Sequence, residues 1–438
     1  MLHAIYYSLV GATLLLLVIW FLRSDWGIRS QFDLFVITWA YYALCVPVDL
    51  FLGLSAEGPF LLPDLNEARY FHTVVEVTIY YYTLAIGYVL AYALLPHATA
   101  ADTRAFLAAP FWWTKVPIVR LPPLWLIMTL LCLVMAVYIG SYDGIDRGAR
   151  AAMLRGDPSA RLGNILTLRL TIAAVIVLIV LLNDRKQARW VVVGGVAVSL
   201  LSGGRTVAVF ILVAYLMRHD VVISRQTRVL LVVGGFLFAM FLKAAYVYVA
   251  SVFILGQPLS PLDLLTGRID AGISFSGLEG IGGYAWPVYF LEKGDSPLWL
   301  GWSYVEIAAR NTLPDFITGT GVPTLSMQFS PEVQPNSRLD PSGRAFSAIA
   351  EAWLNFGSIG PLLVGILFGI AAKILDTGPR GLFFILFAGM SMRLFRSDFA
   401  SAYNSYIVVT GAMACLTYVL FLLWQHVTPR LRLERQQS

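Results

Sequence analysis

Long apolar runs dominate this chain and alternate with short polar segments. A bilayer-crossing helix needs about 20 apolar residues. Hydrophobic residues make up 58% of the 438 positions and charged residues only 13%, outside the range of soluble domains. We therefore expect an all-α polytopic membrane protein, with spans near 2–22, 32–54, 73–95, 122–140, 163–182, 228–250, 345–374, 380–394 and 404–426.

Basic loops set the expected orientation, because Lys and Arg concentrate on the cytoplasmic side of a membrane. Segments 183–189 and 218–228 and the C-terminal tail are basic and are placed inside. Residues 189–218 must then cross twice with about 14 residues per leg, or about 21 Å of helix against about 30 Å of hydrocarbon. We expect a re-entrant-like hairpin with its tip, SGGRT, below the outer surface. A single continuous helix with a snorkelling arginine is the alternative.

These assignments predict three regions and about eleven transmembrane helices, with the N terminus outside and the C terminus inside. Residues 1–250 hold transmembrane helices and the hairpin 189–218. Residues 251–344, rich in proline, glycine and aromatic residues, form a large folded cap loop on the outer side. Residues 345–438 hold the last transmembrane helices and a cytoplasmic tail.

Arginines gather on the expected outer side, against the usual charge trend. Arg147 and Arg150 lie in loop 141–162, Arg205 at the hairpin tip and Arg344 at the end of the cap. A guanidinium offers a fixed fork of donors to phosphate oxygens and keeps its charge when partly buried. The cluster therefore predicts a site for a lipid-linked phosphate or diphosphate. Pairing of these arginines with nearby aspartates or lipid head groups is the alternative.

Ser347, Glu351 and Asn355 recur every four residues and so share one helical face. Glu351 precedes Lys373 by 22 residues, about 33 Å along a continuous helix, which places it near the outer boundary of the hydrocarbon. A partly desolvated carboxylate there could act as a general base on a hydroxyl. A structural Glu–Arg pair is the alternative reading, and Asp398 in FRSDF is the rival base.

Several familiar chemistries lack their sequence signals. No DxD pair occurs in an external loop, and the outer side has few histidines, so we expect no catalytic metal and no cofactor. The absence of GxSxG, Walker A and HExxH argues against serine hydrolases, ATPases and zincins. No basic run alternates with aromatics, so nucleic-acid binding is not expected.

Three segments together resemble the Wzy-type repeat-unit polymerases of bacterial O-antigen and exopolysaccharide assembly. They are the hairpin LLSGGRTVAV, the stretch GWSYVEIAARNTLPDF in the long outer loop, and AFSAIAEAWLNFGSIGPLLVGILFG before the last pair of spans. The resemblance covers the architecture from about residue 120 to the C terminus. It implies a metal-independent, GT-C-like glycosyltransferase of the bacterial inner membrane whose active site faces the periplasm. External arginines of this family bind undecaprenyl diphosphate, a role that would fall here on Arg205, with Arg147, Arg150 and Arg344 as further candidates.

The resemblance also implies a reaction. A growing glycan would move from undecaprenyl diphosphate to a hydroxyl of an incoming lipid-linked repeat unit, with Glu351 or Asp398 removing the proton and Arg205 stabilising the leaving group. The implied partners are undecaprenyl-diphosphate-linked oligosaccharide, membrane lipids and a chain-length regulator or co-polymerase. An O-antigen ligase-like transferase is one alternative, disfavoured because residues 251–344 contain no histidine. A flippase or transporter of lipid-linked oligosaccharide is the other, disfavoured by the large one-sided cap.

Overall fold

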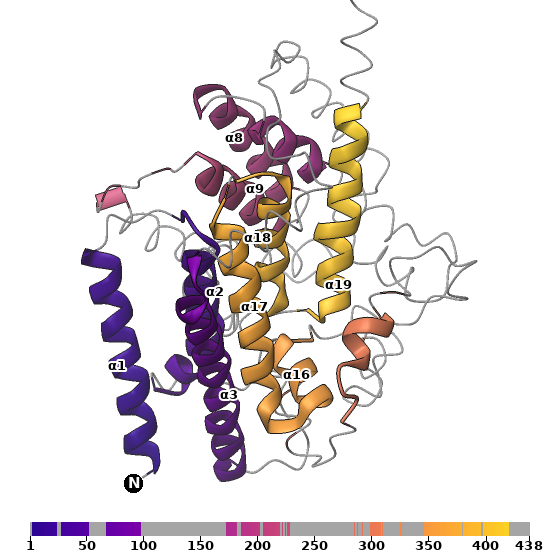
Figure 1. Cartoon of the computed structure of the whole chain (residues 1–438). Coiled ribbons are helices and arrows are strands. Elements are labelled where there is room, and N and C mark those ends of the chain that lie inside the picture. Colours follow the sequence, from indigo (N-terminus) through magenta and orange to yellow (C-terminus); the bar gives the residue numbers. More distant parts are fainter. Residues whose placement is uncertain are drawn as a thin grey trace, which may run out of the picture.

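Every regular element in the described part of the chain is a helix (Figure 1). The computed structural model describes the following residues of the chain. Apart from single positions between 221 and 227, between 284 and 291 and at 309 and 325, these are 2–23, 28–51, 67–97, 172–181, 185–201, 205–219, 298–307, 346–378, 380–395 and 397–419.

Three long helices begin the chain: α1 (Leu2–Arg23), α2 (Gln31–Phe51) and α3 (Glu67–Leu94). The start of α2 is fixed by a reciprocal cap, in which Ser30 Oγ accepts from the Asp33 amide at 3.0 Å and Asp33 Oδ2 accepts from the Ser30 amide at 3.0 Å. The first helix is largely exposed along its length. It attaches to α3 through a 2.6 Å hydrogen bond between the hydroxyls of Thr13 and Tyr82.

The segment 189–218 forms two helices, α8 (Arg185–Leu201) and α9 (Arg205–Arg218). The Tyr215 hydroxyl donates to the Arg185 carbonyl at 3.3 Å, so the end of α9 lies beside the start of α8 and the pair is an antiparallel hairpin. Their 17 and 14 residues give lengths of about 26 and 21 Å. Both legs are shorter than the hydrocarbon core of a bilayer, at about 30 Å.

The C-terminal region contains α16 (Ala348–Phe356), a 3₁₀ turn η6 (Gly357–Ile359), α17 (Gly360–Asp376), α18 (Leu382–Leu394), α19 (Phe399–Tyr403) and a π-helical stretch η7 (Asn404–Val409). The expected continuous helix from Glu351 to Lys373 is wrong. Gly357 has a φ of +63°, which ends α16, and a Cβ at Gly360 would collide with the Ala352 carbonyl. Because the helix breaks here, the depth of about 33 Å inferred for Glu351 from helical rise does not hold.

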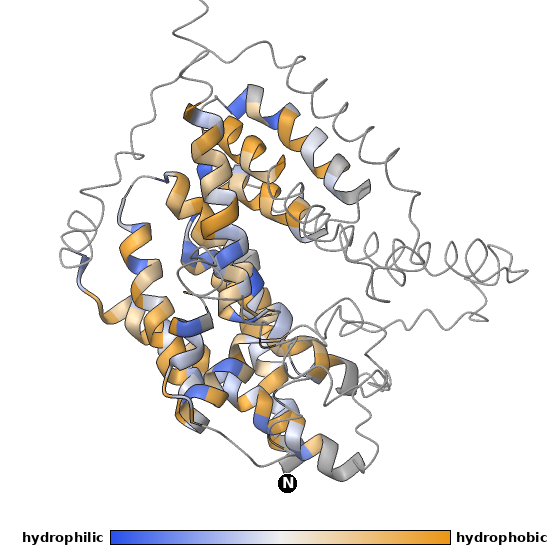
Figure 2. Ribbon diagram, turned by 90° about the vertical axis from the view of Figure 1, so that its right-hand side faces the viewer, coloured by the Kyte–Doolittle hydropathy of each residue, from blue (hydrophilic) through white to orange (hydrophobic). Residues whose placement is uncertain are grey.

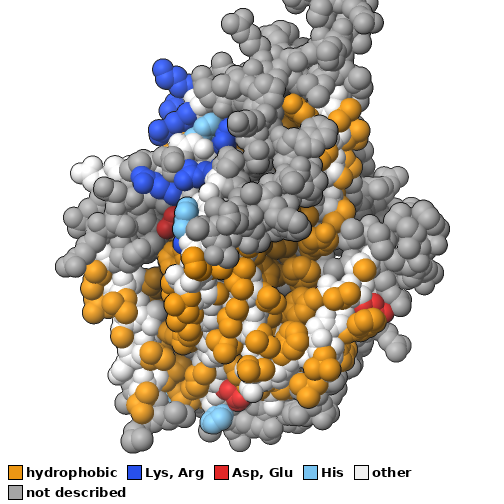
Figure 3. Space-filling view, viewed as in Figure 1, with side chains coloured by type: hydrophobic (Ala, Val, Ile, Leu, Met, Phe, Trp, Pro, Cys, Tyr) orange, Lys and Arg blue, Asp and Glu red, His pale blue; other side chains and the backbone are white. Residues whose placement is uncertain are grey.

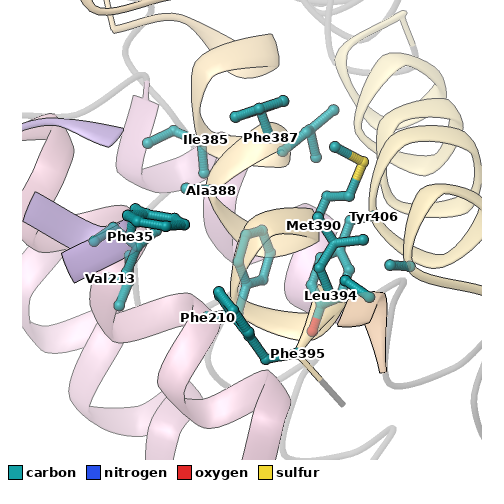
Figure 4. Close-up of a cluster of buried hydrophobic side chains, with 14 of the residues drawn as sticks. Phe35, Phe210, Val213, Ile385, Phe387, Ala388, Met390, Leu394, Phe395 and Tyr406 are labelled. Atoms are coloured by element: carbon teal, nitrogen blue, oxygen red, sulfur yellow. The ribbon is translucent and has the colours of Figure 1, made fainter. Parts of the chain in front are cut away.

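Close backbone contact joins α17 to α3. A Cβ added at Gly365 or Gly369 would collide with the carbonyl oxygens of Leu84 and Tyr88. Small residues four apart allow this approach between membrane helices, where dispersion forces and not water exclusion hold helices together. A second contact region joins α2, α9, α18 and η7 through interlocking side chains that include Phe35, Phe210, Val213, Met390 and Tyr406 (Figure 4).

Four helical stretches are long and apolar enough to cross a membrane: Gln31–Val48, Phe71–Leu94, Ala348–Asp376 and Phe399–Val419. Shorter apolar helices, such as Ile172–Leu181, accompany them, and hydrophobic residues cover most of the helical ribbon (Figure 2). The predicted all-α class is therefore confirmed for the described residues, as is the presence of helices that could span a membrane. The predicted spans 122–140 and 228–250 lie outside the described residues, so the count of eleven stays a prediction.

Basic side chains collect at one end of the bundle (Figure 3). Arg218, at the end of α9, donates to the Arg380 carbonyl at 3.4 Å, and Arg380 donates to the Met217 carbonyl at 2.9 Å. The loop before α18, the end of α9 and the start of α8 therefore share one end. This is the arrangement that a double crossing of the hairpin requires.

Candidate functional site

The predicted polar face of the 347–355 segment lies inside the protein. The Ser347 hydroxyl caps α16 by accepting a hydrogen bond from the Ala350 amide at 3.3 Å. Ser347, Glu351 and Asn355 are each 0% exposed. The i, i+4, i+8 spacing thus places three polar side chains together in an otherwise apolar helix, where each requires a hydrogen-bond partner.

The Glu351 carboxylate receives two hydrogen bonds from segments distant in sequence. Ser303 Oγ donates to Oε1 at 2.7 Å, and the Phe399 amide donates to Oε2 at 2.6 Å. Ser303 belongs to the π-helical turn η4 (Ser303–Ile307), and Phe399 is the first residue of α19. One buried carboxylate therefore joins the long loop, α16 and the start of the last span.

Asn355 completes this network. Its Oδ1 accepts from the amides of Gly301 and Ser303 at 3.0 and 3.4 Å. Its Nδ2 donates to Ser303 Oγ at 2.7 Å and to the Glu351 carbonyl at 2.8 Å. Every donor and acceptor of this amide is used. We call the side chains of Ser303, Glu351 and Asn355 with the Phe399 amide the Glu351 network.

The loop that carries Ser303 is docked onto the end of α16. The amides of Trp299 and Leu300 donate to the carbonyls of Leu354 and Asn355 at 3.2 and 2.9 Å, which satisfies carbonyls that a helix end leaves without partners. Leu298 and Leu300 have φ values of +46° and +49°. This conformation is uncommon for non-glycine residues and persists where surrounding contacts enforce it, often at functional sites.

Asp398 lies next to the Glu351 network and is 1% exposed. Its Oδ1 accepts from the Ser401 amide at 3.3 Å and caps α19, while Oδ2 accepts from the Leu325 amide at 2.9 Å. The carboxylates of Asp398 and Glu351 are close enough for like-charge repulsion. The structure thus brings the two candidate bases together, and it uses both oxygens of Asp398 to hold backbone.

Tyr304 was not predicted from the sequence, yet it directly follows Ser303 of the Glu351 network in η4. The ring stacks on Phe356 at 6.4 Å and meets Phe399 edge-on at 5.4 Å. The hydroxyl is buried and has no hydrogen-bond partner among the described residues. Burial and the neighbouring Glu351 carboxylate raise the pKa of Tyr304 well above its ordinary value. The phenol therefore stays protonated at neutral pH and keeps its O–H as a donor.

The remaining predicted site residues are placed only in part. Arg205 is the first residue of α9, whereas Arg147, Arg150 and Arg344 lie outside the described residues. The hydrogen bonds to Glu351 in the described part of the chain come from a serine hydroxyl and a backbone amide, not from the arginine of the structural-pair alternative. Within the same part, no group of three or more His, Cys, Asp or Glu side chains could hold a metal ion.

The chain matches no protein-family model, no curated protein and no solved structure. The likeness to the Wzy-type polymerases therefore stays a prediction.

Proposed function

We propose that this chain is a polysaccharide repeat-unit polymerase that transfers a growing glycan from undecaprenyl diphosphate to a hydroxyl of an incoming lipid-linked repeat unit. The observation that carries the proposal is the buried Glu351 carboxylate, hydrogen-bonded to Ser303 of the GWSYVE stretch. Two of the three segments behind the resemblance thus meet at one ionisable group. A structural role alone does not call for a carboxylate at this position, since burying one is costly.

The chemistry follows from a carboxylate acting as general base. The acceptor hydroxyl attacks the anomeric carbon of the donor glycan, a new glycosidic bond forms, and the bond to the lipid diphosphate breaks. Glu351 takes the hydroxyl proton, and the diphosphate leaves with the bonding electron pair. A base must lie within hydrogen-bond reach of the proton that it removes, so the acceptor hydroxyl would bind directly at the Glu351 network.

The proposed diphosphate site lies at the tip of the α8–α9 hairpin. Arg205 is the first residue of α9. It therefore lies at a helix N-terminus, where the helix dipole and the free backbone amides favour an anion. Arginine also matches phosphate oxygens with two parallel hydrogen bonds. Both features would stabilise the charge that grows on the leaving diphosphate. Arg147, Arg150 and Arg344 are proposed as further contacts to the same group.

The product identifies the function. Purified protein in nanodiscs is incubated with the undecaprenyl-diphosphate-linked repeat unit extracted from a strain that lacks this chain, without added metal or nucleotide. A polymerase gives a ladder of longer lipid-linked glycans. A ligase-like transferase gives no ladder until a different acceptor lipid is supplied, and a flippase moves the unit between leaflets without lengthening it. Either of these two results would refute the polymerase assignment.

A further inference from the structure

We infer that the Tyr304 hydroxyl, together with the Glu351 carboxylate, forms the binding site for the acceptor sugar hydroxyl. This inference rests on the proposed function and adds to it a specific acceptor contact. The acceptor hydroxyl donates its hydrogen to Glu351 and accepts a hydrogen bond from Tyr304. Tyr304 is thereby a substrate-binding residue and Glu351 the base.

Geometry places the tyrosine at this site from two sides. Tyr304 directly follows Ser303, which donates to Glu351 Oε1 at 2.7 Å. Its ring contacts Phe399 at 5.4 Å, and the Phe399 amide donates to Glu351 Oε2. Both residues that hold the carboxylate therefore also hold the tyrosine. Tyr304 as a whole is only partly buried, while its hydroxyl is fully buried.

The hydrogen-bonding capacity of the site matches that of an alcohol. A sugar hydroxyl has one donor and two acceptor positions. Glu351 supplies acceptor oxygens, and the Tyr304 O–H supplies a donor that no described residue uses. The raised pKa of Tyr304 keeps that donor present throughout the neutral range. By contrast, Ser303 and Asn355 already use their hydrogen-bonding groups within the Glu351 network.

The energetics separate this role from a structural one. A buried polar group without a partner lowers the free energy of unfolding, so its removal does not destabilise the protein. Removal of a hydrogen-bonded group, by contrast, eliminates a stabilising interaction. Tyr304→Phe removes the hydroxyl and leaves the ring contacts with Phe356 and Phe399. A binding role therefore predicts an unchanged or higher Tm for this variant, and a structural role predicts a lower one.

The test uses Tyr304→Phe and a matched control in the full-length protein. Tyr406→Phe is the control, because the Tyr406 hydroxyl is also buried but its ring packs against Phe210, away from the Glu351 network. Two probes are titrated: the extracted lipid-linked repeat unit and undecaprenyl diphosphate without glycan. We expect Tyr304→Phe to weaken binding of the repeat unit about three- to tenfold, as for loss of one hydrogen bond. Binding of the bare lipid and both affinities of Tyr406→Phe should match wild type.

Each other outcome has a defined meaning. The inference would be overturned if Tyr304→Phe bound the repeat unit as well as wild type or weakened the binding of both lipids equally. It would also be overturned by an equal loss of binding in Tyr406→Phe or by a clear fall in the Tm of Tyr304→Phe. If wild type extends the repeat unit but Tyr304→Phe binds it normally, the polymerase function stands and the acceptor contact fails. If wild type binds the unit without extending it while Tyr304→Phe binds it weakly, the glycan-hydroxyl site stands and the polymerase function fails.

Discussion

Asn355 holds the Glu351 network together through four hydrogen bonds. It orients Ser303, which in turn orients the carboxylate, so it acts on the proposed base without touching substrate. The amide also anchors the loop at Gly301. Removing this side chain should therefore affect stability before it affects chemistry.

We predict that Asn355→Ala lowers the free energy of unfolding by about 2–4 kcal/mol, because two buried amides, of Gly301 and Ser303, lose their acceptor. Thermal unfolding in detergent measures the change. Asn404→Ala, at a half-buried position at the start of η7, is the control and should cost far less. Equal destabilisation by both changes would argue against the role given to Asn355.

At this scale the sequence predicted part of the site. The four-residue spacing placed Ser347, Glu351 and Asn355 on one face because helical periodicity is a local property. Ser303 and Tyr304 could not be found this way. Ser303 meets Glu351 across 48 residues of chain, and no periodicity links such distant positions.

Among the elements, α3 and α17 depend most on close backbone approach. Gly365→Ala places a methyl group against the Leu84 carbonyl and should destabilise the protein by about 1–3 kcal/mol, as overpacking does. Gly11→Ala in α1 meets nothing within 4 Å and should be neutral or slightly stabilising. Comparison of the two Tm values tests the contact, and a silent Gly365→Ala would contradict it.

In the hairpin α8–α9, Arg205 is the residue proposed to bind the diphosphate. If Arg205 holds a diphosphate, Arg205→Lys should recover little of the polymerisation that Arg205→Ala abolishes, because an ammonium keeps the charge but loses the bidentate fork. The measurement is polysaccharide yield in cells that lack the native copy, with the inserted amount of each variant determined on blots. Near-normal yield from Arg205→Lys would argue against the diphosphate role.

The elements also show where sequence reasoning failed. Apolar residues continue through 345–374, and the span predicted there corresponds to the apolar helical stretch Ala348–Asp376. The expected continuous helix, however, is interrupted at Gly357, where φ is +63°. The signal was present in FGSIGP, since Gly and Gly-Pro punctuate helices. The length of the apolar run outweighed this signal, because a membrane environment selects for apolar residues in helices and turns alike.

For the whole molecule, the start of α8, the end of α9 and the loop before α18 share one end. This end carries basic residues, so we expect it to face the cytoplasm. In a variant with Cys45, Cys132 and Cys415 replaced by serine, Ser224→Cys should react with an impermeant thiol reagent only after the membrane is opened.

Ser296→Cys, in the predicted outer cap and outside the described residues, is the opposite case and should react in intact spheroplasts. Labelling of both positions from the same side would overturn the predicted topology.

The role of Glu351 as the base is tested by comparing wild type and Glu351→Gln in the extension of the extracted lipid-linked repeat unit. The amide keeps the shape of the side chain but cannot accept the proton, so the rate of ladder formation should fall by about 10²–10⁴-fold. The amide also has one acceptor oxygen fewer for the Ser303 and Phe399 donors, so binding of the unit and the Tm should fall, but by far less than the rate. A Glu351→Gln protein that builds the ladder at the wild-type rate would contradict the central claim that this buried carboxylate is the base.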